Sequence, residues 1–148
     1  NAQINAFNIG YHTMKNYRNF NTLIINEKEI RHEMRDKVGK LENLIINLAN
    51  EKSVNNLIVT KGRSGSILYN KDKKIFFTSE AYATKIIDKI GAGDTMLSLM
   101  GLCLKSNIDS ELALLISSLG AAKSVESLAN KESINKINML KTLENFFK

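Results

Sequence analysis

Short apolar runs alternate along the chain with longer segments in which apolar residues recur every three or four positions. The runs 22–26 (TLIIN) and 55–62 (NNLIVTKG) are rich in β-branched residues and too short for helices, so each predicts a buried strand. Apolar residues at helical spacing predict an amphipathic helix over 41–52. Residues 27–36 are good helix formers with acidic residues in the first turn, and a short helix is also predicted over 8–18.

The second half of the chain begins with a predicted β-hairpin. Residues 65–79 form two apolar or alternating arms around the polar turn Asn70–Lys74. Residues 93–105 are apolar on nearly every side, which predicts a helix that is buried all round. Either Asp109 or Ser110 is expected to cap the helix that follows.

A final amphipathic helix is predicted over residues 133–147. Its inner face is expected to consist of Ile134, Ile137, Leu140, Leu143 and Phe147. Because strands alternate with helices apart from the hairpin, the predicted fold class is α/β, with a mostly parallel sheet flanked by helices. The chain shows no internal repeat or low-complexity linker, so residues 1–148 are expected to form one domain or part of one.

Composition narrows the class of protein without identifying a function. Hydrophobic residues make up 43% and charged residues 24%, a balance typical of a soluble globular protein, and no apolar run approaches the roughly 20 residues that span a bilayer. With a lone Cys103 and no recognisable signal peptide, a cytoplasmic location is expected, without a membrane partner. The net charge of +6 is scattered along the chain rather than gathered in a stripe, which disfavours nucleic acid as a partner, and an anionic small-molecule substrate explains the positive excess equally well.

The sequence Gly91-Ala92-Gly93-Asp94 opens the helix predicted over 93–105. Small residues at a helix start expose successive backbone N–H groups to phosphate oxygens, with the helix dipole behind them. A carboxylate is a poor phosphate ligand because like charges repel, but Asp94 could act as a general base toward an attacking hydroxyl. The alternative is a tight turn in which Asp94 is only the N-cap, and these four residues alone do not decide between the two.

Two further polar loops follow the predicted strands, where α/β proteins place their ligand-binding loops. In the loop 60–65 (TKGRSG), Arg63 either reaches a phosphate or only solvates the surface. The same loop offers hydroxyl donors and glycines that allow close backbone approach: Thr60, Ser64, Gly62 and Gly65. In the loop 26–29, Asn26 and Glu29 supply an amide and a carboxylate, which suit phosphate and water-held Mg²⁺. The three loops together favour a nucleotide site.

The segment 88–94 (DKIGAGD) resembles the D-T-x-G-A-G-D signature of the ribokinase-like (PfkB-type) sugar kinases. The N-x-x-E at 26–29 and the T-x-G-x-x-G at 60–65 match two further motifs of this family in the same order, and the similarity covers most of residues 20–130. The opening sequence NAQINAFNIG is most similar to the bacterial heptose-phosphate kinase branch. Family members are about twice as long, so the resemblance implies that residues 1–148 are the C-terminal, ATP-binding portion of such a kinase.

The resemblance implies an ATP-dependent phosphotransferase that acts on a sugar or sugar-phosphate hydroxyl, with ATP and Mg²⁺ as cofactors. Asp94 would be the catalytic base, and Gly91, Ala92 and Gly93 would form the anion hole. Glu29 would hold Mg²⁺ through water. The residues implied to bind ATP are Asn26, Thr60, Gly62, Arg63, Ser64, Gly65, Ser117, Ser118 and Ala121, of which the last three would border the adenine.

Two loops depart from the family pattern at the monovalent cation site. Asp88 corresponds to the first cation loop, but Lys89 replaces the small hydroxyl residue that usually follows it. The segment 128–130 (LAN) stands where a glycine is common in the second loop. The use of a monovalent cation is therefore left open.

The implied partners are ATP, a sugar or sugar phosphate, and the N-terminal half of the same kinase, which carries most sugar contacts. Without that half, this portion is expected to be inactive, and its apolar split face should favour association, a homodimer included, or marginal stability. The alternative is a non-catalytic nucleotide-binding or interaction module with a kinase-derived fold. The intact Asp94, Gly93, Asn26 and Glu29 favour the kinase, since a module without turnover needs no base. The sequence does not identify the sugar.

Overall fold

The computed structural model describes residues 14, 17–88, 90–127 and 134–147. The chain divides into two compact units, one comprising 1–62 and 66–77 and the other 63–65 and 78–148. The helix predicted over 8–18 lies largely outside the described residues.

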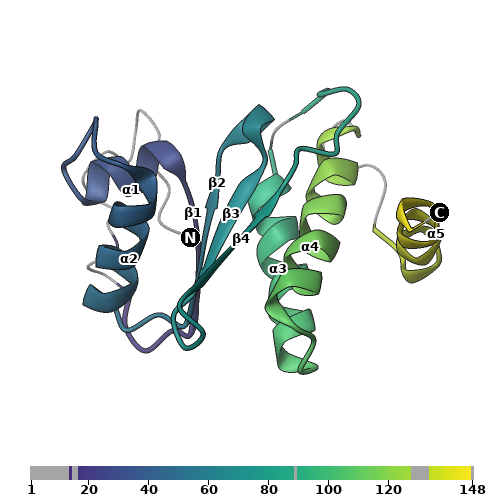
Figure 1. The fold of residues 1–148 in the computed structure, drawn as a ribbon. Helices are drawn as coiled ribbons and strands as arrows, with labels where there is room; N and C mark the ends of the chain where they lie inside the picture. The colour runs from purple at the N-terminus through teal and green to yellow at the C-terminus, as the bar shows by residue number, and fades with distance from the viewer. Residues whose placement is uncertain (1–13, 15–16, 89, 128–133, 148) are drawn as a thin grey trace. The chain divides into compact units, whose positions relative to one another are not determined.

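The described part of the first unit is built on a sheet (Figure 1). Its four strands, in both sequence and spatial order, are β1 (Thr22–Asn26), β2 (Asn56–Thr60), β3 (Ser66–Asn70) and β4 (Ile75–Ser79). Strands β1 and β2 are parallel, β2 and β3 are antiparallel, and β3 continues into β4 through the turn 71–74. The predicted α/β class and the hairpin are confirmed, and the described sheet is mixed because the hairpin adds antiparallel partners to one parallel pair.

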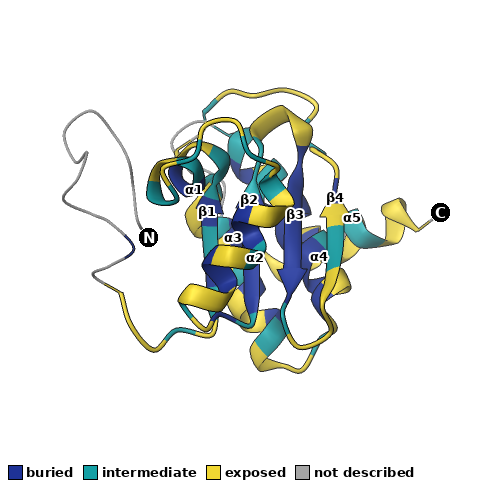
Figure 2. Ribbon diagram, turned by 60° about the vertical axis from the view of Figure 1, so that its left-hand side comes forward, coloured by how far each residue is buried: buried dark blue, intermediate teal, exposed yellow. Residues whose placement is uncertain are grey.

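Two helices lie on one face of this sheet, α1 (Glu27–Glu33) and α2 (Leu41–Glu51) (Figure 1). The strands alternate their side chains between the two faces, and those facing the helices form the core together with apolar residues of α1 and α2. The buried core includes Leu23, Ile25, Ile30, Leu44, Ile45, Leu48, Leu57, Val59, Ile67 and Tyr69. Strand β3 is buried along its whole length (Figure 2). Helix α1 ends before the predicted residue 36, because Arg35 adopts a left-handed backbone conformation with φ of 51°.

The second unit contains three helices in its described part, α3 (Ala92–Lys105), α4 (Ser110–Val125) and α5 (Lys136–Phe146). Helices α3 and α4 pack against each other, and Gly120 lies at the contact. A Cβ atom at Gly120 would collide with the side chain of Leu99, so the glycine permits the close approach of the two helices. Asp109 is the N-cap of α4, and its side chain accepts a hydrogen bond from the N–H of Glu111.

Helix α3 confirms the predicted element but not its predicted burial. The buried residues Met96, Met100 and Cys103 follow one side of the helix. Leu97 and Leu102 are 39% and 66% exposed, so the prediction of a helix buried all round was wrong. The described neighbours cover one side of α3, and apolar character on its other sides does not correspond to burial.

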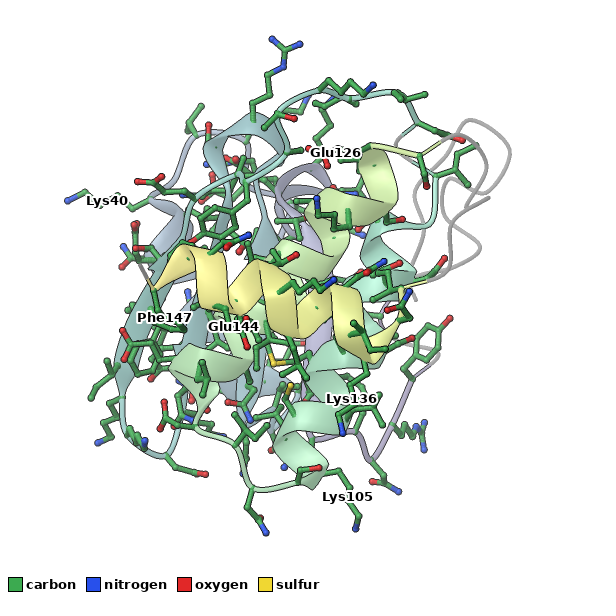
Figure 3. All side chains as sticks on the ribbon, turned by 90° about the vertical axis from the view of Figure 1, so that its right-hand side faces the viewer. Lys40, Lys105, Glu126, Lys136, Glu144 and Phe147 are labelled. Atoms are coloured by element: carbon green, nitrogen blue, oxygen red, sulfur yellow. The ribbon has the colours of Figure 1, made fainter. Side chains whose placement is uncertain are left out.

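Helix α5 likewise forms where predicted, but its predicted inner face is only partly buried. Met139 is 8% exposed, and of the predicted inner residues Ile134 and Leu143 are half-buried, whereas Ile137, Leu140 and Phe147 are 66%, 48% and 69% exposed. The side chain of Phe146 meets Tyr82 edge to face, with ring centroids 5.4 Å apart. Figure 3 shows α5 with Lys136 at its start and Phe147 at its end. The helix has apolar residues on more than one side, so spacing alone did not determine which side is buried.

Candidate active site

The N-x-x-E motif forms the start of helix α1. The side-chain oxygen of Asn26 accepts a hydrogen bond from the N–H of Glu29 at 2.9 Å, and a carboxylate oxygen of Glu29 accepts one from the N–H of Asn26, also at 2.9 Å. This reciprocal pair is a capping box, and it holds both side chains in a fixed orientation directly after β1. This role was not predicted, although an Asn followed three residues later by Glu, before a helical segment, is its sequence signal.

The first residues of the first two predicted loops lie next to each other, at the carboxyl ends of neighbouring parallel strands. Asn26 and Thr60 are the last residues of the parallel strands β1 and β2, and they are opposite each other in the register. Thr60 is half-buried, and Gly62 follows it with φ of 60°. Both loops follow strands as predicted, and β2 is buried along most of its length, whereas β1 alternates half-buried and buried residues.

The remaining residues of the T-x-G-x-x-G loop belong to the second unit. Arg63 and Ser64 are exposed in a short 3-10 turn, η2 (Gly62–Ser64). Gly65 is buried with φ of 77°, and a Cβ atom there would collide with the backbone carbonyl oxygen of Ser79. Gly65 therefore allows the loop to pass close to the end of β4, and its backbone conformation disfavours residues other than glycine.

The substitution Gly65→Ala is expected to lower the free energy of unfolding by roughly 2 to 4 kcal/mol, because it adds a steric collision to the cost of a left-handed alanine. The matched control is Gly62→Ala, since Gly62 also has positive φ but nothing within 4 Å of an added Cβ. The control should lose only about 1 to 2 kcal/mol. Urea unfolding of the two variants measures the difference, and equal losses would contradict the steric argument.

The Gly91–Asp94 segment forms the first turn of helix α3. Gly91 is the N-cap, with φ of 87° in the left-handed region. Asp94 is exposed and lies in the first helical turn, so the alternative that it is the N-cap is wrong. Gly93 is exposed, and nothing lies within 4 Å of an added Cβ. The first N–H groups of a helix have no acceptor within it, and the open space at Gly93 leaves room for a phosphate to approach them.

The segment before Gly91 is attached to the end of helix α4. The backbone N–H groups of Ile87 and Asp88 donate to the carbonyl oxygen of Val125 at 2.8 and 3.2 Å. Thr84 donates its N–H and its hydroxyl to Oε1 of Glu126, both at 2.8 Å. This contact was not predicted, because the two residues are 42 positions apart and form no recognisable pattern.

Asp88 has a local contact of its own. Its Oδ1 accepts a hydrogen bond from the N–H of Ile90 at 2.9 Å, which forms a tight turn just before the N-cap Gly91. Lys89 lies outside the described residues. The prediction that Asp88 contributes to a monovalent cation site stays a prediction.

The three residues predicted to border an adenine lie on helix α4. Ser117 is fully buried, and its hydroxyl donates to the carbonyl oxygen of Leu114 at 3.1 Å. Ser118 is 9% exposed, and Ala121 is half-buried. Their contact with an adenine stays a prediction.

Metal ligands are sparse in the described part of the chain. No group of three or more His, Cys, Asp or Glu side chains there could hold a metal ion. Mg²⁺ in kinases usually keeps several waters and binds through one or two carboxylates together with substrate phosphates. Glu29, oriented by the capping box, fits such an indirect role better than a dedicated protein cage. Of the helices described, none is long and apolar enough to cross a membrane.

Comparison with known families and curated proteins gives consistent results. Residues 12–136 match the family described as pfkB family carbohydrate kinase. The chain is 32% identical over 117 residues to the bifunctional protein HldE of Campylobacter curvus, covering 77% of this chain and 24% of that protein. It is 31% identical over 121 residues to the 5-dehydro-2-deoxygluconokinase of Bacillus subtilis, covering 76% and 37%. The chain thus spans well under half the length of these relatives.

Solved structures show the same fold. The nucleoside kinase of Methanocaldococcus jannaschii, an archaeal member of the ribokinase family, superposes with a TM-score of 0.67 at 27% identity, covering 84% of this chain and 40% of that one. The ribokinase of Thermotoga maritima gives a TM-score of 0.69 at 26% identity, covering 84% and 42%. The predicted ribokinase-like fold is confirmed, over about two fifths of each of these structures.

Proposed function

Because the chain belongs to the pfkB family of carbohydrate kinases, we propose that residues 1–148 are the C-terminal, ATP-binding portion of an ATP-dependent sugar kinase. Its acceptor is a hydroxyl group of a sugar or a sugar phosphate. The observation that carries the proposal is the start of helix α3, where small residues expose backbone N–H groups and Asp94 stands exposed in the same turn. A helix start of this kind offers both an anion hole and a base.

In the proposed reaction, Asp94 accepts the proton of the acceptor hydroxyl as its oxygen forms a bond to the γ-phosphorus of ATP. The bond from the γ-phosphorus to the β–γ bridging oxygen breaks, and ADP leaves with that electron pair. The N–H groups of Gly91, Ala92 and Gly93 stabilise the negative charge on the phosphoryl oxygens during transfer. The proton on Asp94 then passes to solvent.

The motif residues of the first unit are proposed to handle the nucleotide phosphates. Asn26 and Thr60 present an amide and a hydroxyl from neighbouring strand ends, and both groups can hydrogen-bond phosphate oxygens. Glu29 would accept hydrogen bonds from water bound to Mg²⁺, which when bound neutralises phosphate charge. The other residues proposed to contact ATP are Gly62, Arg63, Ser64, Gly65, Ser117, Ser118 and Ala121.

Other segments of the kinase would supply the rest of the active site. Most of the sugar site would come from the N-terminal half of the kinase, so residues 1–148 alone are expected to lack turnover. Lys89 follows Asp88 in the sequence, and a positive charge at this neighbouring position would disfavour a monovalent cation at Asp88.

Titration of the chain with Mg-ATP is expected to shift the backbone amide NMR signals of 60–65 and 91–94. With the sugar half absent, the affinity should be near the millimolar range, about −4 kcal/mol. Mg²⁺ with adenosine is the matched control, because adenosine lacks phosphates and should leave 91–94 unshifted. Shifts confined to the lysine-rich turn 71–74 would indicate nonspecific attraction and contradict the proposed site.

A further inference from the structure

The segment that leads into the proposed anion hole has little regular structure of its own. Among residues 80–88 and 90, none belongs to a helix or strand. Its conformation therefore depends on attachments to neighbouring elements, and hydrogen bonds attach it to the C-terminal end of helix α4.

Glu126 makes the side-chain attachment. It is the C-cap residue of α4 (Figure 3), and its Oε1 accepts both the N–H and the hydroxyl hydrogen of Thr84. Its Oε2 lies 3.5 Å from the ammonium nitrogen of Lys123. Partial burial acts to raise the pKa of Glu126, but the hydrogen bonds from Thr84 and the nearby Lys123 outweigh it and hold the pKa below its usual value. The carboxylate of Glu126 is therefore ionised at neutral pH, and its hydrogen bonds from Thr84 are charge-assisted.

A second attachment lies next to the first. The carbonyl oxygen of Val125 accepts the N–H groups of Ile87 and Asp88, so two successive residues of α4 hold the segment at two points. We call Glu126, Val125 and their partners Thr84, Ile87 and Asp88 the α4 clamp. Because α4 also packs along α3, the clamp ties the approach to Gly91 to the same scaffold that supports the helix bearing Asp94.

We propose that Glu126 is a positioning residue for phosphoryl transfer, which through Thr84 fixes the segment leading to Gly91 and Asp94. This inference rests on the proposed kinase function. Without an acceptor at position 126, the segment loses both hydrogen bonds of Thr84, the Val125 attachment remains, and the first turn of α3 loses part of its orientation. A base or anion hole that is displaced by about an ångström loses a large part of its catalytic effect, whereas ATP contacts elsewhere persist.

The test uses the complete kinase that contains these residues, with the variants Glu126→Ala and Glu126→Gln. Glutamine retains an oxygen that can accept from Thr84, so it should rescue what alanine loses. The matched control is Lys123→Ala, which removes the ion pair but leaves the bonds to Thr84 in place. The readouts are kcat, KM for ATP, the unfolding midpoint, and amide hydrogen exchange at Ile87 and Asp88.

Glu126→Ala is expected to lower kcat roughly 10-fold with KM for ATP nearly unchanged, and to accelerate exchange at Ile87 and Asp88. Glu126→Gln should recover most of the lost kcat, because its neutral oxygen still accepts from Thr84 although the bonds are no longer charge-assisted. Lys123→Ala should stay close to the unaltered enzyme. Unchanged kcat in Glu126→Ala, or an equal loss in Glu126→Gln, would overturn the proposal. Absence of sugar phosphorylation by the unaltered enzyme would contradict the kinase function. Amide exchange at Ile87 and Asp88 tests the clamp independently of activity, and unchanged exchange in Glu126→Ala would overturn it.

Discussion

Asp94→Asn in the complete kinase is expected to lower kcat by roughly 10² to 10⁴, with little change in KM for ATP. Asparagine keeps the size and the hydrogen-bonding capacity of the side chain but cannot accept the proton of the acceptor hydroxyl. The exposed position of Asp94 in the first turn of α3 leaves its carboxylate accessible to a substrate. Steady-state kinetics with a panel of hexoses, pentoses and heptose phosphates would measure the effect.

The matched control for Asp94→Asn is Glu111→Gln. Glu111 is an exposed acidic residue in the first turn of α4, so this change also removes a negative charge from a helix N-terminus. Each variant should lose about 0.3 to 1 kcal/mol of stability through the helix dipole. Only Asp94→Asn should lose turnover, and an Asp94→Asn enzyme that retains most of its turnover would reject the proposed mechanism.

The sequence predicted where elements occur better than which way they face. The strands at 22–26 and 56–60 and the hairpin arms followed from β-branched runs bounded by polar turns, and their positions are confirmed. Helices α3 and α5 also formed where predicted, yet Leu102 and Ile137 are exposed. Apolar spacing reports the period of a helix, whereas its buried side depends on the neighbours that pack against it.

The candidate site shows the same division between local and long-range information. Parallel pairing explains why Asn26 and Thr60 could be predicted to lie close together, since the carboxyl ends of adjacent parallel strands lie side by side. The capping box of Asn26 and Glu29 is local and could have been predicted. The contact of Thr84 with Glu126 could not, because it depends on how α4 packs rather than on any short pattern.

Gly93→Ala is expected to lower kcat/KM for phosphoryl transfer by roughly 10², comparable to the loss of one donor of an anion hole, because alanine keeps its N–H but blocks access to it. The added methyl group would occupy the space through which phosphate oxygens approach the first N–H groups of α3. The folded chain itself has no need of a glycine here, since nothing lies within 4 Å of the new Cβ. Alanine should instead stabilise the helix by about 0.5 to 1 kcal/mol.

Gly101→Ala is the matched control, because Gly101 lies in the same helix, is also exposed, and has nothing within 4 Å of an added Cβ. Both variants should therefore unfold at slightly higher urea concentration than the unaltered protein. Only Gly93→Ala should lose activity, since Gly101 lies further along α3, away from the helix start. If Gly93 is needed for turnover but contributes nothing to the stability of the fold, the requirement for glycine is explained by a phosphate that binds next to it. Equal kcat/KM values for the two variants would remove Gly93 from the anion hole.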